Sequence, residues 1–151
     1  MDSYFCDSSA IVKRYVTEAG SSWVMGITDP IVGNDIYVVQ LTGVEVMSAL
    51  VRKVPAVSPA HLGQAISDFK YDLQRQYQRV AITETLVARA MSLVETRRLR
   101  GYDAVQLAAA LEVFVACSAL GVPLLFLSAD GNLNVAAAAE GLTVDNPTLH
   151  P

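Results

Sequence analysis

Short apolar runs alternate with longer helical patterns along this 151-residue chain, and this alternation constrains its fold more than any other feature. Parallel strands are joined by long crossover connections, which are usually helices. The pattern therefore predicts an α/β fold with a central, largely parallel sheet. The five expected strands cover residues 3–6, 36–39, 80–82, 123–127 and 142–144.

Helical patterns fill the intervals between these runs. Ser58 and Pro59 predict a helix start, because serine caps a helix and proline suits its first position. Pro55 is expected to end the helix before it, and Gly121 the long apolar helix. Helices are expected at about residues 10–16 (capped by Ser8 or Ser9), 42–53, 59–77, 84–97, 103–120 and 132–140, with a further stretch opening at Gly20. We find no repeat or linker, so residues 1–151 are predicted to form one domain with a loose tail at 146–151.

The composition narrows the class of protein. With 52% hydrophobic and 17% charged residues, the chain is expected to fold around a large core. Its net charge of −4 argues against binding nucleic acid through bulk positive charge, but leaves room for a metal or a small cationic patch. Cys6 and Cys117 lie in apolar stretches and are expected to be buried free thiols, which fits a cytoplasmic protein. Residues 104–127 are mostly apolar, but Gly121 and Pro123 interrupt them, so we expect a buried helix and strand and no membrane association.

Four acidic residues are the candidates for chemistry. Ligands of open α/β sheets bind outside the carboxyl ends of the strands, and Asp7 and Asp130 follow the first and fourth expected strands. Each of the two has the alternative of only capping the next helix. Glu45 and Asp103 lie in mostly apolar helical segments, where a carboxylate is rarely buried unless it is paired or binds a metal. Capping its own helix is the alternative for Asp103.

Carboxylates that converge without a cationic partner repel one another, and a hard divalent cation removes that repulsion. Because the candidate ligands are oxygen atoms, Mg²⁺ or Mn²⁺ is the expected ion. One such ion or a pair can activate water and stabilise the leaving oxygen in phosphodiester hydrolysis. His61 and His150 are far apart in the sequence and are expected to be solvated, so zinc is not predicted.

Four segments, in order, resemble the signature segments of PIN domains, and more narrowly those of the VapC toxins of type II toxin–antitoxin systems. They are Asp7-Ser8-Ser9-Ala10, Thr42-Gly43-Val44-Glu45-Val46 with Ser48-Ala49-Leu50, Leu99-Arg100-Gly101-Tyr102-Asp103-Ala104-Val105-Gln106-Leu107-Ala108 and Leu127-Ser128-Ala129-Asp130. The resemblance extends over essentially the whole chain. It implies a three-layer α/β/α PIN-like fold with a mostly parallel sheet of about five strands, and a Mg²⁺-dependent ribonuclease in which Mn²⁺ substitutes. It also implies a cognate antitoxin as partner, and frequent homodimers.

The resemblance also assigns roles by position. The acidic cluster, expected to hold the metal and to catalyse, is Asp7, Glu45, Asp103 and Asp130, and the supporting hydroxyls against the RNA substrate are Ser8 and Ser128. Arg100, in the basic cluster that begins at Arg97, is a candidate phosphate contact, with a solvated helix end as the alternative. Gln106 stands where many relatives have a histidine that is not a metal ligand. Residues 131–134 lack the basic residue that many relatives carry there.

Two other functions stay open. An aspartyl phosphotransferase or phosphatase also has an aspartate at the end of its first strand. That chemistry needs a second carboxylate two residues later, where this chain has Ser9, and a later lysine that is missing here. The other alternative is a non-catalytic PIN-like binding or scaffold protein, in which the acids are helix caps and a metal, if any, is structural.

Overall fold

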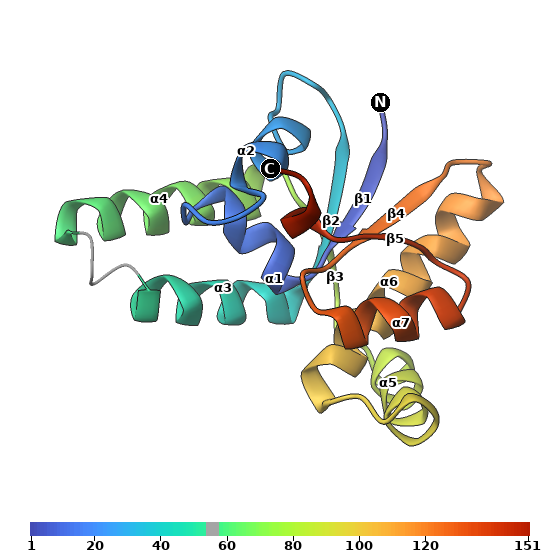
Figure 1. Ribbon diagram of the computed structural model, residues 1–151. Coiled ribbons are helices and arrows are strands. Elements are labelled where there is room, and N and C mark those ends of the chain that lie inside the picture. The colour runs from blue at the N-terminus through green and yellow to red at the C-terminus, as the bar shows by residue number, and fades with distance from the viewer. Residues whose placement is uncertain (54–57) are drawn as a thin grey trace.

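The computed structural model describes residues 1–53 and 58–151 (Figure 1). Five parallel strands form one sheet with the order β3-β2-β1-β4-β5. The strands are β1 (Ser3–Cys6), β2 (Asp35–Val39), β3 (Gln78–Val80), β4 (Leu124–Leu127) and β5 (Thr143–Asp145). The chain runs outward from β1 to β3 and then returns to the other side of β1. The order in which strands are added to the sheet therefore reverses between β1 and β4, and open α/β sheets bind ligands at such a position.

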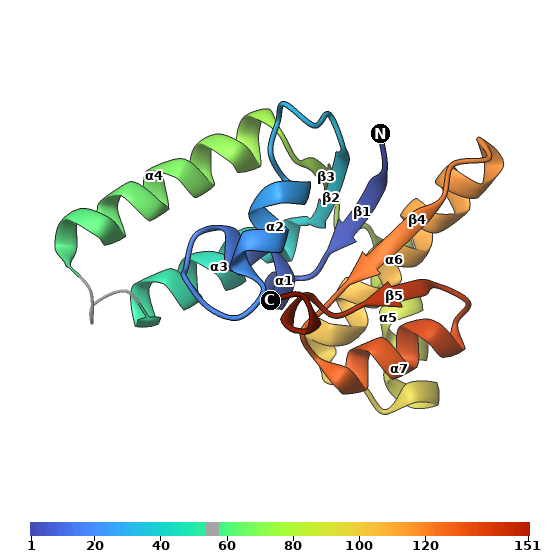
Figure 2. The same cartoon turned by 45° about the horizontal axis from the view of Figure 1, so that its top comes forward.

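Helices cover both faces of this sheet (Figures 1 and 2). They are α1 (Ser8–Ile11), α2 (Ser21–Ile27), α3 (Gln40–Lys53), α4 (Pro59–Arg75), α5 (Glu84–Arg97), α6 (Gly101–Ala119) and α7 (Gly131–Ala139), with 3₁₀ turns η1 (Val12–Arg14) and η3 (Pro147–Leu149). One apolar cluster packs α5, α6 and α7 on one face, and another packs α1, α3 and α4 on the other. Phe5 joins the first cluster while Tyr4 and Cys6 join the second, as alternation along a strand requires.

The predicted strands and long helices are all present, with shifts at their ends. Ser58 caps α4 by accepting a hydrogen bond from the His61 N–H (3.1 Å), and Pro59 is the first helical residue, as predicted. The predicted end of the preceding helix at Pro55 lies outside the described residues. Helix α6 begins at Gly101, two positions before the predicted start, so its first turn includes Asp103.

The helix after β1 differs from its prediction. It begins at Ser8 and ends at Ile11, and the 3₁₀ turn η1 follows it. Its cap is Asp7, whose Oδ1 accepts a hydrogen bond from the Ala10 N–H (2.9 Å), and neither Ser8 nor Ser9 takes that role. Aspartate is as good a cap as serine, and here the strand delivers Asp7 to the capping position in an extended conformation.

The predictions of a loose C-terminal tail and a solvated His150 were wrong. Residues 147–149 form the turn η3, which Asn146 caps. The His150 ring stacks on Trp23 of α2 with 4.0 Å between ring centroids, and its Nε2 lies 2.9 Å from Asp145 Oδ2. Local sequence does not show the stacking contact, because the Trp23 ring comes from a helix near the other end of the chain. His61 is exposed, as predicted.

By length and composition only, helix α6 could cross a membrane. Half of its most apolar 18-residue stretch, however, is buried within the protein. It packs mainly against α5 and also contacts β2 and β4, so it has the surroundings of a core helix. Cys6 and Cys117 are buried and free, as predicted.

Candidate functional site

All four candidate acids line one small pocket at the carboxyl ends of β1 and β4. Asp7 follows β1, Glu45 lies in α3, Asp103 lies in the first turn of α6, and Asp130 precedes α7. The pocket has a volume of about 120 Å³ and is lined by Asp7, Ser8, Ser9, Glu45, Tyr102, Asp103, Gln106 and Asp130. Two larger pockets lie along α4, and none of the four acids lines them.

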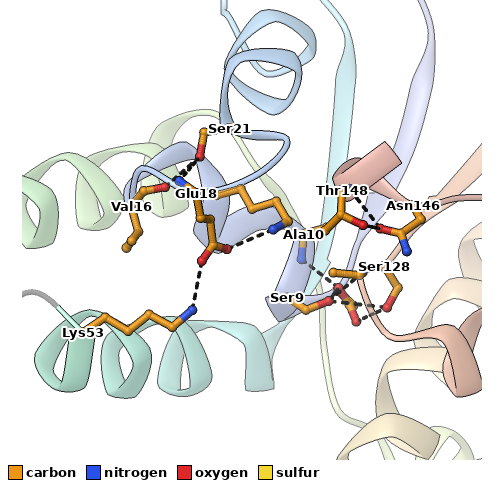
Figure 3. Close-up of polar contacts among 12 residues, drawn as sticks. Ser9, Ala10, Val16, Glu18, Ser21, Lys53, Ser128, Asn146 and Thr148 are labelled. Atoms are coloured by element: carbon orange, nitrogen blue, oxygen red, sulfur yellow. Dashed lines mark hydrogen bonds and ion pairs between the residues drawn. The ribbon is translucent and has the colours of Figure 1, made fainter. Parts of the chain in front are cut away.

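Asp7 is buried, and its side chain accepts three hydrogen bonds. Its Oδ1 accepts from the Ala10 N–H (2.9 Å) and from Ser9 Oγ (2.7 Å), and its Oδ2 accepts from Ser128 Oγ (2.7 Å). Figure 3 shows Ser9, Ala10 and Ser128 converging at this point. Burial raises the pKa of Asp7 to about 6, although the hydrogen bonds favour the ionised form. Asp7 is therefore both a helix cap and a pocket residue.

Ser128 joins Asp7 to Asp130. It is fully buried, and its hydroxyl accepts a hydrogen bond from the Asp130 N–H (3.0 Å) while it donates to Asp7. Asp130 Oδ1 caps α7 by accepting from the N–H groups of Asn132 (2.9 Å) and Leu133 (3.2 Å). Asp130 is thus also a helix cap, and both capping bonds use the same carboxylate oxygen, Oδ1.

Glu45 is half-buried and is held from two other elements. Its Oε1 accepts hydrogen bonds from Ser8 Oγ (2.7 Å) and from Gln106 Nε2 (2.9 Å). In α3 the residues Thr42, Val46 and Leu50 form the fully buried stripe. Since Glu45 lies beside that stripe and not within it, its carboxylate emerges from the core at the pocket.

Asp103 does not cap its own helix, so that alternative was wrong. The N-cap of α6 is Arg100, which makes no side-chain capping bond. Partial burial and then the charge of Asp130 raise the pKa of Asp103 to about 6; Glu45 adds to the rise and Arg100 opposes it. Asp103 in turn adds to the raised pKa of Asp7. The acids are therefore close enough to repel one another.

Arg100 lies beside this acidic pocket and is fully exposed. Its Nη1 donates a hydrogen bond to Oη of Tyr102 (2.8 Å), and Tyr102 lines the pocket. That bond, together with the charges of Tyr102, Asp103 and Asp130, raises the pKa of Arg100. Elsewhere in the basic cluster, Arg97 pairs with Glu140, which agrees with a structural helix end. Arg100 is thus the member of the cluster best placed to contact a phosphate.

The donor set suits a hard divalent cation. The eight lining residues offer carboxylate, hydroxyl and amide oxygens and include no lysine, arginine or histidine. Within residues 1–53 and 58–151, no three side chains of Asp, Glu, His or Cys are arranged closely enough to hold an ion by themselves. Mg²⁺ usually takes only one or two carboxylates directly and keeps several waters. The residues therefore fit this ion without forming a closed cage.

The sequence interpretation missed part of this site. Ser9 Oγ donates to Asp7 and also accepts from the Ala129 N–H (2.9 Å), so it connects the segments after β1 and β4. Gln106, which was given no role, contacts Glu45 from α6. The available signal was a single amide in an otherwise apolar helical segment, three residues after Asp103.

No protein-family model matches the chain, and no curated protein matches it. Three solved structures each match 95% of its length. PAE2754 from Pyrobaculum aerophilum matches over 89% of its own chain, with 16% identity and a TM-score of 0.55. A toxin–antitoxin complex from Klebsiella pneumoniae matches over 97%, with 14% identity and a TM-score of 0.57. VapBC2 from Rickettsia felis, bound to a DNA fragment from its promoter, matches over 98%, with 10% identity and a TM-score of 0.61.

These likenesses establish the fold, because nearly the whole of each chain superposes. The identities are too low to show more than the fold. The predicted three-layer α/β/α PIN-like fold is confirmed, and so, at the level of the fold, is the predicted likeness to VapC proteins.

Proposed function

We propose that this chain, which has the PIN-like fold, is a Mg²⁺-dependent endoribonuclease that cleaves phosphodiester bonds of RNA. The observation that carries the proposal is the meeting of Asp7, Glu45, Asp103 and Asp130 in one pocket at the point where the strand order reverses. These four residues are the proposed holders of the ion, and Mn²⁺ is expected to replace Mg²⁺. The mutual repulsion of the acids is the feature that a bound cation relieves.

The side chains around this pocket would orient the acids and bind the phosphodiester. When bound, the ion supplies an activated water and charge stabilisation for the leaving oxygen. Ser128 and Ser9 hold Asp7 in one orientation, and Ser8 does the same for Glu45. Arg100, exposed beside the pocket, offers planar N–H donors suited to a phosphate oxygen.

Two of the similar structures are toxin–antitoxin proteins, which supports the further proposal that this chain is the toxin of such a pair. Its partner would be a cognate antitoxin that covers the acidic pocket in the cytoplasm, and the chain would form a homodimer. A basic segment of the antitoxin is suited to this pocket, because it would meet carboxylates that repel one another.

The test uses purified chain, free of any partner, with single-stranded and hairpin RNA. Cleavage is expected with Mg²⁺ or Mn²⁺ and is expected to stop in EDTA. Asp7→Asn and Asp103→Asn should each abolish it, whereas Glu95→Gln, an exposed charge change on α5, should leave it intact. Cleavage that persists in chelator, or that neither pocket variant affects, would overturn the proposal.

A non-catalytic binding protein is the second candidate. It is favoured by the capping roles of Asp7 and Asp130, since both carboxylates would have a structural purpose without any ion. It predicts no RNA cleavage, with or without a divalent ion. The phosphotransferase alternative has less support, because Ser9, two residues after Asp7, is bonded to that aspartate and no lysine lines the pocket.

A further inference from the structure

Gln106 is a buried amide in a helix made mostly of apolar residues. Its exposed fraction is 2%, and its neighbours Leu107 and Ala108 are fully buried. Burying an amide costs free energy unless its polar atoms find partners. A feature of the site must therefore account for a glutamine at this position.

The amide nitrogen meets three oxygen atoms of the candidate site. Gln106 Nε2 lies 2.9 Å from Glu45 Oε1, 2.9 Å from Ser8 Oγ and 3.0 Å from Thr42 Oγ1. An ionised carboxylate can only accept, so the nitrogen and not the oxygen of the amide must face Glu45. In the part of the chain that the structure describes, Gln106 Oε1 is buried without a partner. The arrangement thus keeps the bond to Glu45 although it leaves an acceptor unsatisfied.

This amide connects the helices that carry two of the four acids. Gln106 lies on α6, one turn after Asp103, and Glu45 lies on α3. Ser128 plays the corresponding part for the other two acids, because it bonds to both Asp7 and Asp130. Two buried neutral side chains therefore hold the pocket together: Gln106 of α6 binds the Glu45 carboxylate, and Ser128 binds the Asp7 carboxylate and the backbone N–H of Asp130.

We propose that Gln106 is a positioning residue that orients Glu45 for divalent-cation binding, a role that rests on the proposed metal-dependent function. A neutral amide can fix a carboxylate without cancelling its charge, whereas a lysine or arginine would compete with the cation. Removing a group that is hydrogen-bonded to a metal ligand, and so orients it, typically weakens metal binding by about 10- to 100-fold.

The experiment measures Mn²⁺ affinity by calorimetry and by electron paramagnetic resonance, without RNA. Gln106→Met keeps the length of the side chain and removes its donors, and should weaken Mn²⁺ binding about 10- to 100-fold. Gln64→Met is the matched control, because Gln64 Nε2 also donates to a carboxylate, Asp68 Oδ1 (2.7 Å), on the exposed side of α4. The control should keep wild-type affinity. Circular dichroism checks that each variant is folded.

Two further variants make the outcome decisive. Gln106→His retains a ring N–H for Glu45 and should recover most of the lost affinity, which a purely structural role would not predict. If Gln106→Met does not fold, Gln106→Asn replaces it, because asparagine keeps an amide that is one methylene too short to reach Glu45. Wild-type affinity in the folded variant overturns the positioning role and leaves the proposed function intact. Wild-type protein that binds no Mn²⁺ overturns both.

Discussion

Ser128 Oγ donates a 2.7 Å hydrogen bond to Asp7 Oδ2 across 121 residues of sequence. The bond joins the segments that leave the central strand β1 and its neighbour β4, which pair along their whole length from Ser3↔Leu124 to Cys6↔Leu127. Because parallel pairing brings the carboxyl ends of both strands together, the register of the sheet alone places these two side chains within reach.

Replacing Ser128 by alanine should therefore destabilise the fold. The substitution leaves Asp7 Oδ2 and the Asp130 N–H without their shared partner in a buried place, which we expect to cost about 1–3 kcal/mol of the free energy of unfolding. Urea denaturation measures the change. Ser67→Ala, at an exposed position of α4, is the control and should stay within about 0.5 kcal/mol of wild type. Equal stability of the two variants would contradict the prediction.

Mn²⁺ should stabilise the native protein through the four acids. At about 100 times its Kd, an ion that binds only the native state adds about 2.7 kcal/mol to the free energy of unfolding. Asp103→Asn removes a proposed ligand and should lose most of this gain, whereas Glu95→Gln should keep it. Thermal unfolding with Mn²⁺ and with EDTA provides the measurement. An equal gain in Asp103→Asn, or none in wild type, is the contrary result.

Glu18 should stabilise the protein in a pH-dependent way. Its Oε1 lies 3.0 Å from Nζ of the buried Lys13, and its Oε2 lies 3.1 Å from Nζ of Lys53, toward which Figure 3 shows it pointing. Partial burial raises the pKa of Glu18, but the hydrogen bonds and charges of the two lysines outweigh it and leave the pKa below its ordinary value of 4.5. The ionised form is therefore the one that the native state prefers.

The sign of the effect follows from that lowered pKa. The contribution of Glu18 is present above the pKa of the unfolded chain and is lost as the pH falls through the lower native value. Glu18→Gln should cost about 1–3 kcal/mol at pH 7, since it leaves Lys13 buried without its ion pair. Denaturation curves at several pH values should show this difference shrinking toward pH 3. A difference that grows as the pH falls would be inconsistent with the ion pairs.

Gly20→Ala should detach the C-terminal turn. Gly20 has φ +88°, and a Cβ there would lie 2.2 Å from the Pro147 carbonyl oxygen. Gly33→Ala is the matched control, because Gly33 has φ +75° with nothing within 4 Å of the added carbon, so it should show only the backbone cost of about 1–2 kcal/mol. Trp23 is the single tryptophan of the chain and stacks on His150, so its fluorescence reports the detachment. Unchanged emission in Gly20→Ala would contradict the prediction.

Much of the fold could be predicted because it depends on sequence patterns that extend over only a few residues. The inner strands β1, β2 and β4 are mostly apolar, as expected for strands that helices cover on both faces, whereas the edge strands β3 and β5 are short and partly exposed. Among the long helices, α4 and α5 carry the start signals Ser58 and Thr83. The positions of Asp7 and Asp130 followed from the same logic, since a residue after a parallel strand lies at the ligand-binding edge. Placing Glu45 and Asp103 beside them required the family resemblance.

The orientation of Gln106 and the docking of the C-terminal turn could not be predicted. Helix α6 is apolar on nearly every side, so periodicity does not show which face meets α3. Trp23 and His150 are separated by almost the whole chain, and no local signal couples them.

By itself, the sequence determined the order and kind of the elements and the identity of the oxygen donors, because hydrophobic periodicity and capping act over a few residues. Only the tertiary structure decided which donors share a pocket, which neutral groups hold them and how far burial raises the pKa values of Asp7 and Asp103. Those properties depend on distances between segments far apart in the chain, and packing sets such distances.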